Sequence, residues 1–135
     1  MDQLHIEKGE FTPLISFDSE SRQLEIVGIS RPENVGEFYE PVLNWFEELE
    51  KEIEYGVFSI DEDKPFVLKM HLTYFNSATS KVLWQMLEIF NRLIAKGLKI
   101  KVEFYYDEGD EQMLEDGQEL SETSNIPFEF IEIED

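Results

Sequence analysis

The sequence predicts one α/β domain that spans residues 1–135, with a single mixed sheet of about five strands, two long helices and one short helix. Three observations predict this class. The length suits one hydrophobic core and is too short for two. Segments with strand-like alternation and helix-like periodicity follow one another with short breaks. Several strands alternate apolar and polar residues, which favours helices mainly on one face and a wet opposite face.

The chain begins with two predicted strands. Residues 11–17 and 23–29 have the composition of strands, and the Asp-Ser-Glu-Ser sequence between them is typical of a turn. A long helix is predicted next over residues 33–53, because its apolar residues recur at helical spacing. Ser30 or Arg31 lies just before this helix and Pro32 suits a first turn. Pro41 predicts that the helix is kinked or split.

A third strand and a second long helix come next. Residues 66–74 alternate regularly between apolar and polar side chains, as a half-buried strand does. Residues 78–96 present a wide apolar face at helical spacing, which predicts the most apolar helix of the domain. Gly97 is typical of a helix C-terminal cap, and Lys96 suits the negative end of the helix dipole.

In the last third of the chain the residue pattern predicts a strand, a weak acidic helix and a final strand. Residues 98–105 alternate clearly, residues 110–120 form the helix, and residues 127–133 form the last strand. In that strand the apolar phase shifts to Ile131 and Ile133, which predicts a bulge or a strand end. Four basic or imidazole side chains fall on the polar phase of the strands, and we expect them on the open face: Lys69, His71, Lys99 and Lys101.

Charge and composition exclude several classes of function. The formal net charge of −20 argues against nucleic acid and anionic membranes as partners and favours a basic or neutral partner surface. The chain lacks cysteine, and no apolar run is long enough to span a membrane. The first residues do not resemble a signal peptide, so we expect a cytoplasmic protein.

No residue pattern indicates catalysis, a metal site or a cofactor. The two histidines, His5 and His71, are far apart in sequence, and a solvated or capping role is the ordinary interpretation. The acidic runs 61–63 and 107–111 do not have EF-hand spacing. No carboxylate pair stands apart and no glycine-rich phosphate loop is present. We therefore expect a protein that is not an enzyme.

One segment combines several hydroxyl groups with a helix start. Residues 76–80 read Asn-Ser-Ala-Thr-Ser and join the third strand to the apolar helix. Ordinary capping by Asn76 or Ser77 explains the composition. A helix N-terminus also tolerates an anion, so a hydroxyl there can carry a phosphoryl group, with Lys81 as a partial counter-charge. The residues alone leave both interpretations open.

Three stretches resemble the SiaC-like family of bacterial regulatory phosphoproteins. Residues 28–34 (GISRPEN), leading into 38–41 (FYEP), resemble its first motif, and residues 74–81 (YFNSATSK) resemble its second. Residues 105–111 (YYDEGDE) resemble the third, where Phe104 or Tyr105 replaces a tryptophan. On this resemblance the site comprises the phosphoacceptor Ser77, with Thr79 as second choice, and the supporting or partner-binding residues Asn76, Thr79, Ser80, Lys81, Tyr74, Pro32, Glu33 and Asn34.

The resemblance implies a fold like the STAS domains of anti-sigma-factor antagonists. It also implies a non-catalytic signalling protein that a kinase phosphorylates and a PP2C-type phosphatase restores. The bare protein would bind an effector such as a diguanylate cyclase, raising cyclic-di-GMP and favouring biofilm formation. Ser77 stands where the family has a threonine, and Ala78 where it has a serine. A small-molecule or anion-binding domain without phospho-switching is the alternative, and the oligomeric state stays open.

Overall fold

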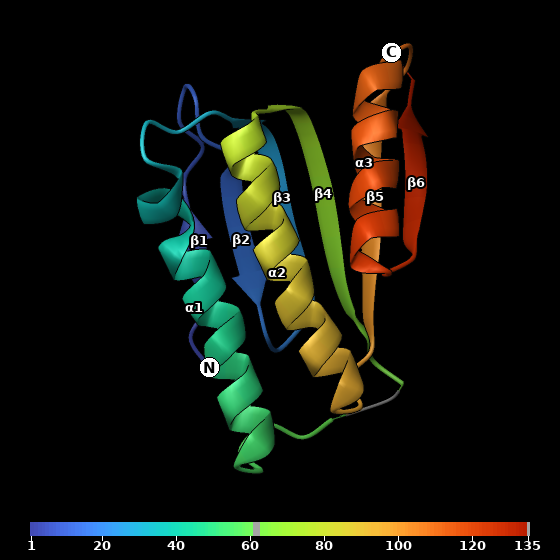
Figure 1. The fold of residues 1–135 in the computed structure, drawn as a ribbon. Helices are drawn as coiled ribbons and strands as arrows, with labels where there is room; N and C mark the ends of the chain where they lie inside the picture. The colour runs from blue at the N-terminus through green and yellow to red at the C-terminus, as the bar shows by residue number, and fades with distance from the viewer. Residues whose placement is uncertain (61–62, 135) are drawn as a thin grey trace.

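The computed structural model describes residues 1–60 and 63–134. Within them it shows a mixed sheet and three helices (Figure 1). Asp61 and Glu62, from one of the two acidic runs, lie outside the described residues. In chain order the elements are β1 (Leu4–Ile6), β2 (Leu14–Asp18), β3 (Gln23–Ser30), α1 (Val35–Glu54), β4 (Phe66–Phe75), α2 (Ser77–Ala95), β5 (Ile100–Asp107), α3 (Glu111–Ser124) and β6 (Phe128–Ile133).

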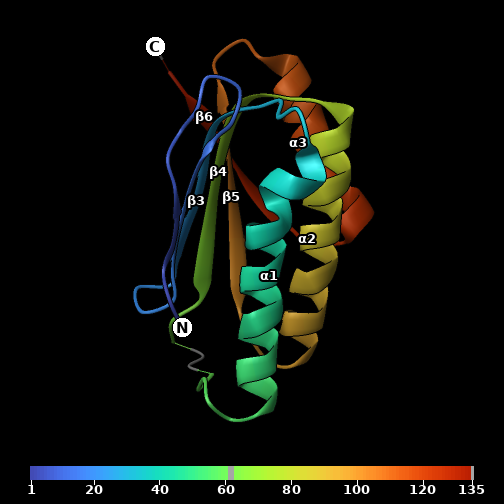
Figure 2. The same ribbon diagram turned by 90° about the vertical axis from the view of Figure 1, so that its left-hand side faces the viewer.

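The sheet follows chain order from β1 to β6. The first three strands pair antiparallel, and β3 to β6 pair parallel, so each later connection needs a crossover helix. All three helices cover the same face of the sheet (Figure 2). The predicted class is confirmed, but the described residues form six strands where five were expected. The missed strand, β1, is only three residues long and too short to show a periodicity.

The core lies between the sheet and the helices. In β4 every second residue from Phe66 to Leu72 is buried, and the residues between them are half-buried. Trp45 of α1 packs edge-on against Phe17 of β2, and Phe46 packs against the same ring at a tilt, both at a ring-centroid distance of 5.2 Å. On the open face, the predicted polar side chains divide into the half-buried pair Lys69 and His71 and the exposed pair Lys99 and Lys101.

The first long helix differs from its prediction at its start. Asn34 caps α1 by accepting a hydrogen bond from the Glu37 N–H at 3.0 Å. The helix therefore begins two residues later than predicted, at Val35, so Ser30 and Arg31 do not lie just before it, and Pro32 precedes the helix instead of forming its first turn. Helix α1 continues through Pro41, so the predicted split is wrong. Its first turn is nevertheless inclined to the rest of the helix (Figures 1 and 2), as expected where proline removes a backbone donor.

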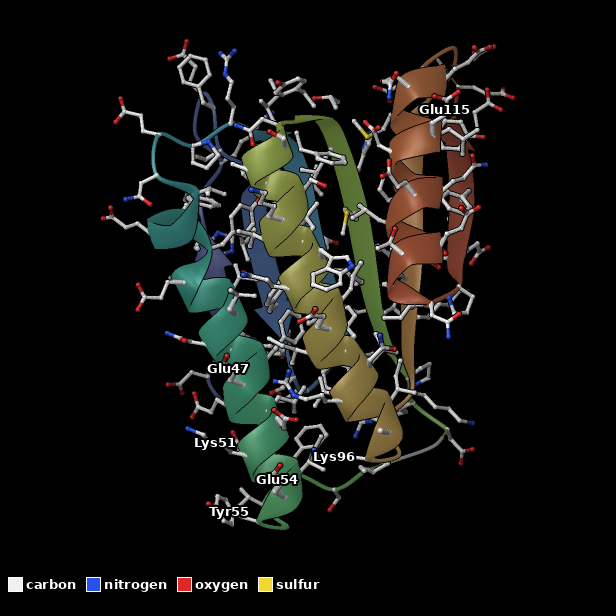
Figure 3. All side chains as sticks on the ribbon, in the orientation of Figure 1. Glu47, Lys51, Glu54, Tyr55, Lys96 and Glu115 are labelled. Atoms are coloured by element: carbon white, nitrogen blue, oxygen red, sulfur yellow. The ribbon has the colours of Figure 1, made fainter. Side chains whose placement is uncertain are left out.

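The two long helices are joined by ion pairs near their C-terminal ends. Glu50 of α1 accepts from Arg92 at 3.0 Å and from Lys96 at 3.1 Å. Glu54 lies 3.4 Å from Lys96, and both residues are labelled in Figure 3. The hydrogen bond from Arg92 holds the pKa of Glu50 below its ordinary value. These contacts fix the packing of α1 on α2 at the end away from the α2 N-terminus.

The register of β6 explains the phase change in the last strand. It pairs with β5 from Phe128 to Ile133 without a break, so the predicted bulge is wrong. Phe128 and Phe130 pack against Phe104 on the helix side, and Ile131 and Ile133 alternate with them toward the open face. The shift of register in the parallel part lies instead between β3 and β4, at Gly28, where φ is +131°.

None of the helices formed by residues 1–60 and 63–134 combines the length and the apolar character that a membrane span requires.

Candidate functional site

The sheet places the start of α2 at the carboxyl edge of the parallel strands. Strand β4 ends at Phe75, beside the end of β3, and the Asn76 N–H donates to the Ser30 carbonyl at 3.3 Å. The Asn76 side chain accepts from the Thr79 N–H at 2.9 Å and caps the helix. Of the two predicted caps, Asn76 is therefore the one used. Ser77 becomes the first helical residue, and its side chain is exposed.

A buried chain of hydroxyl groups anchors this helix end. The Ser30 Oγ lies 2.6 Å from the Tyr39 Oη and 2.9 Å from the Thr79 Oγ1, and the Thr79 hydroxyl also lies 3.3 Å from the Ser30 carbonyl. All three side chains are at most 1% exposed. Burial raises the pKa of Tyr39 to about 12, so its phenol keeps its proton. These hydrogen-bonded hydroxyl groups tie α1, β3 and α2 together at the start of α2.

Beside this helix end lies a groove of about 790 Å³ between α2 and α3. Its floor is partly apolar, with Trp84, 38% exposed, on one wall and Leu120 on the other. Three carboxylates and one ammonium group line it, so its charge is negative. The lining residues are Phe75, Asn76, Ser77, Ser80, Lys81, Trp84, Gln85, Glu88, Asp116, Glu119, Leu120 and Thr123.

The structure brings together only part of the predicted site. Asn76, Ser77, Ser80 and Lys81 line the groove, whereas Thr79 points into the core. Tyr74, 47% exposed, lies in β4 two residues before the cap and does not line the groove.

The first motif lies apart from the groove, at the start of α1. Glu33 and Asn34 border a separate shallow hollow with Glu37 and Phe38, and Asn34 serves as the α1 cap. Pro32 precedes that cap. The link between the two motifs is therefore Ser30, which neither the composition nor the spacing singled out, although it lies inside the first motif.

The third motif has structural roles in this fold. Asp110 caps α3 by accepting from the Met113 N–H at 3.1 Å. Asp107 lies 3.1 Å from the His71 imidazole on the open face. Within residues 1–60 and 63–134, no group of three or more His, Asp or Glu side chains is arranged to hold a metal ion.

Sequence reasoning missed the α3 wall of the groove. Asp116, Glu119 and Thr123 come from a helix that was expected to be short and weak. It runs to Ser124, four residues beyond its predicted end, and closes with Asn125 in the left-handed conformation at φ +60°. One signal for the groove was present in the sequence of α2. Trp84 interrupts the polar side of this otherwise amphipathic helix, and an exposed tryptophan often marks a contact surface.

Comparison with known proteins identifies the family of this chain. The model for the SiaC family of regulatory phosphoproteins matches residues 6–133. This chain belongs to that family. An uncharacterized protein of Pseudomonas aeruginosa strain UCBPP-PA14 is 28% identical over 128 residues, which covers 95% of this chain and 94% of the relative.

Two solved structures of Pseudomonas aeruginosa SiaC share the fold. The crystal structure of apo-SiaC matches with a TM-score of 0.78 and 26% identity, over 97% of this chain and 99% of the other. The crystal structure of the diguanylate cyclase SiaD in complex with its activator SiaC matches with a TM-score of 0.80 and 26% identity. This match covers 96% of this chain and 99% of the other. The recognition of the family from its motifs is confirmed, and so is the α/β class.

Proposed function

We propose that this chain is a non-catalytic, cytoplasmic signalling protein that binds an effector through the groove between α2 and α3, and that phosphorylation of Ser77 controls this binding. The observation that carries the proposal is the position of Ser77. It is the first residue of α2, its side chain is exposed, and it lines the groove together with Trp84. A modification there alters the contact surface without disturbing the core.

The local structure favours Ser77 over Thr79 as the phosphoacceptor. The Thr79 hydroxyl is 0% exposed and lies 2.9 Å from the Ser30 hydroxyl, so phosphorylation would require the start of α2 to open. A phosphate on Ser77 would lie at the positive end of the helix dipole, where an anion is tolerated. Lys81 follows one turn later on the same side of α2 and lines the same groove.

The cost of desolvating the phosphate, more than charge repulsion, is the reason to expect that phosphorylation of Ser77 weakens effector binding. The groove is already acidic, so a fitting effector presents basic or neutral groups there, and these would be attracted to a further negative charge. A phosphoserine carries roughly −1.5 to −2 charges, however, and burying it in an interface that has an apolar floor is costly. Each loss of about 1.4 kcal/mol weakens binding tenfold. The unphosphorylated form is therefore the binding form.

The partners are proposed from the family. SiaC of Pseudomonas aeruginosa is the activator of the diguanylate cyclase SiaD, so a diguanylate cyclase is the proposed effector here. A protein kinase that adds the phosphate and a PP2C-type phosphatase that removes it complete the switch. The acidic lining of the groove, with Glu88, Asp116 and Glu119, speaks against the alternative of an anionic small ligand.

The test has two stages. Mass spectrometry of the protein from its native host maps phosphate on the peptide that covers Tyr74 to Lys81, and we expect it on Ser77. Protein carrying phosphoserine at position 77 is then compared with the bare protein for binding to the host's diguanylate cyclases and to SiaD, by calorimetry. We expect at least about tenfold weaker binding.

Two control proteins accompany this test. Ser77→Ala removes the hydroxyl and should bind as the bare protein does. Gln118→Glu adds one charge on an exposed position of α3 that does not line the groove, and should also bind normally. Equal binding of the phosphorylated and bare proteins, or phosphate found only on other residues, would contradict the proposal.

A further inference from the structure

The last strand leaves one edge of the sheet open. In the described part of the chain β6 pairs with β5 alone, and Figure 1 shows it along the rim of the sheet. It is six residues long and includes neither proline nor lysine, two common features of protected edges. The opposite edge is formed by β1, which has only three residues. The β6 edge is therefore the longer free template for another strand.

The register identifies which backbone groups of β6 face outward. The Ile133 carbonyl accepts from the Glu108 N–H at 2.9 Å, so the backbone of Ile133 points toward β5. In a strand the N–H and C=O of one residue point to the same side, and the next residue points to the other side. The backbone groups of Phe128, Phe130 and Glu132 therefore face the open edge. They present three donors and three acceptors in a row.

Charge indicates what kind of segment this edge accepts. Residues 102–135 contain thirteen Asp or Glu residues and no Lys, Arg or His. On β6, Glu129 is paired with Lys101 at 2.7 Å, whereas the exposed Glu132 forms no ion pair with any described residue. Half-buried aromatic and aliphatic side chains flank these carboxylates on both faces of the strand. Apolar contacts with acidic neighbours suit an extended segment that mixes apolar and basic residues.

We propose that the open edge of β6 binds a basic, extended segment of a partner protein, which adds to the sheet as a further strand. Backbone hydrogen bonds to residues 128, 130 and 132 would supply the contact, and Lys or Arg side chains would supply the preference. A second copy of this chain does not fit as well as a basic segment, because pairing two β6 strands would bring together two edges that each carry Glu129 and Glu132 and no basic residue, and like charges across a ladder are destabilising.

The experiment uses the full chain and a synthetic peptide, acetyl-Lys-Val-Lys-Val-Lys-Val-Lys-amide, followed by NMR titration of the backbone amides. We expect the largest shifts at Phe128, Phe130 and Glu132, and weaker binding as salt rises. The matched pair of variants is Glu132→Pro and Glu132→Gln. Both remove one charge, but only proline removes the outward N–H and obstructs the edge. We expect about tenfold weaker binding for the proline variant and a clearly smaller loss for the glutamine variant, which removes only the charge.

A second peptide keeps the test decisive if the proline variant does not fold. It has the same sequence with N-methyl groups on alternate residues, which keep the charge and block one backbone edge. We expect it to bind at least about tenfold more weakly. If the two peptides bound equally well, the binding would be explained by general charge attraction alone, and the proposal would be overturned. Shifts confined to the groove, or a β6-mediated dimer of the free protein, would overturn it as well.

Discussion

Gly117, in the middle of α3, is expected to be intolerant of even one added methyl group. A Cβ at this position would lie 2.6, 2.7 and 2.8 Å from three ring atoms of Phe104. Ordinary contact begins at 3.4 Å. The Phe104 ring is fully buried and has Phe128 and Phe130 at centroid distances of 6.0 and 5.8 Å, so its neighbours oppose a shift. Gly117→Ala must therefore push α3 away from the sheet.

Two opposing terms set the size of this effect. Overpacking of a core costs about 1–3 kcal/mol. Alanine in place of glycine in a helix interior returns about 1 kcal/mol. Because three contacts are too short at once, the upper half of the overpacking range applies, and we expect a net loss of about 1–2 kcal/mol. For a chain of this length that loss lowers Tm by about 3–7 °C.

The assay is urea unfolding at pH 7, followed by circular dichroism. Gly36→Ala is the matched control, because Gly36 is also helical and its added Cβ meets only the Asn34 Oδ1 at 3.7 Å. We expect this control to be as stable as the natural protein or more stable, by up to about 1 kcal/mol. Phe104→Leu in the Gly117→Ala background should relieve the clash, so the two changes together cost less than their sum. The reasoning is refuted if Gly117→Ala is as stable as Gly36→Ala.

Two further predictions concern polar contacts between elements. Glu50→Gln should destabilise the protein at neutral pH, because Arg92 lowers the folded-state pKa of Glu50. That contribution is present above the unfolded-state pKa and is lost as pH falls, so the gap between the two proteins should close below about pH 4.3. A gap that stays constant on acidification would contradict this account. Tyr39→Phe keeps the ring but removes the phenol that lies 2.6 Å from the Ser30 Oγ. We expect the free energy of unfolding to fall by about 1 kcal/mol and the backbone amides in the first turn of α2 to exchange faster with solvent, as measured by hydrogen exchange. Unchanged exchange at Thr79 and Ser80 would show that the phenol does not anchor this helix end.

Long elements were predictable because their periodicity is strong. The strand β4 and the helix α2 start and end within one residue of their predicted bounds. Both bury one complete face, so the spacing of apolar residues reports directly on the fold. The three-residue β1 had no such signal. The start of α1 was less predictable, since several polar residues before it are acceptable caps and only the path of the chain selected Asn34.

The candidate site was predictable only along one segment. Residues 76–81 contain the hydroxyl groups and the lysine, and both their local chemistry and the family motif drew attention to them. The opposite wall of the groove comes from α3, more than thirty residues later, and its acidic side chains resemble any solvated helix face. Local chemistry did not separate Ser77 from Thr79, because both are small hydroxyl residues at one helix start, and only the family motif ranked Ser77 first.

The sequence by itself determined the fold class, the family and the segment in which a phosphoacceptor is expected. These follow from local spacing and from motifs that are contiguous in the chain. The tertiary structure decided which hydroxyl is accessible. Ser30 and Tyr39, distant in sequence, reach the start of α2 and enclose the Thr79 hydroxyl, while Ser77 remains at the surface of the groove. Accessibility depends on what packs against a residue from elsewhere in the chain, and no local pattern records that.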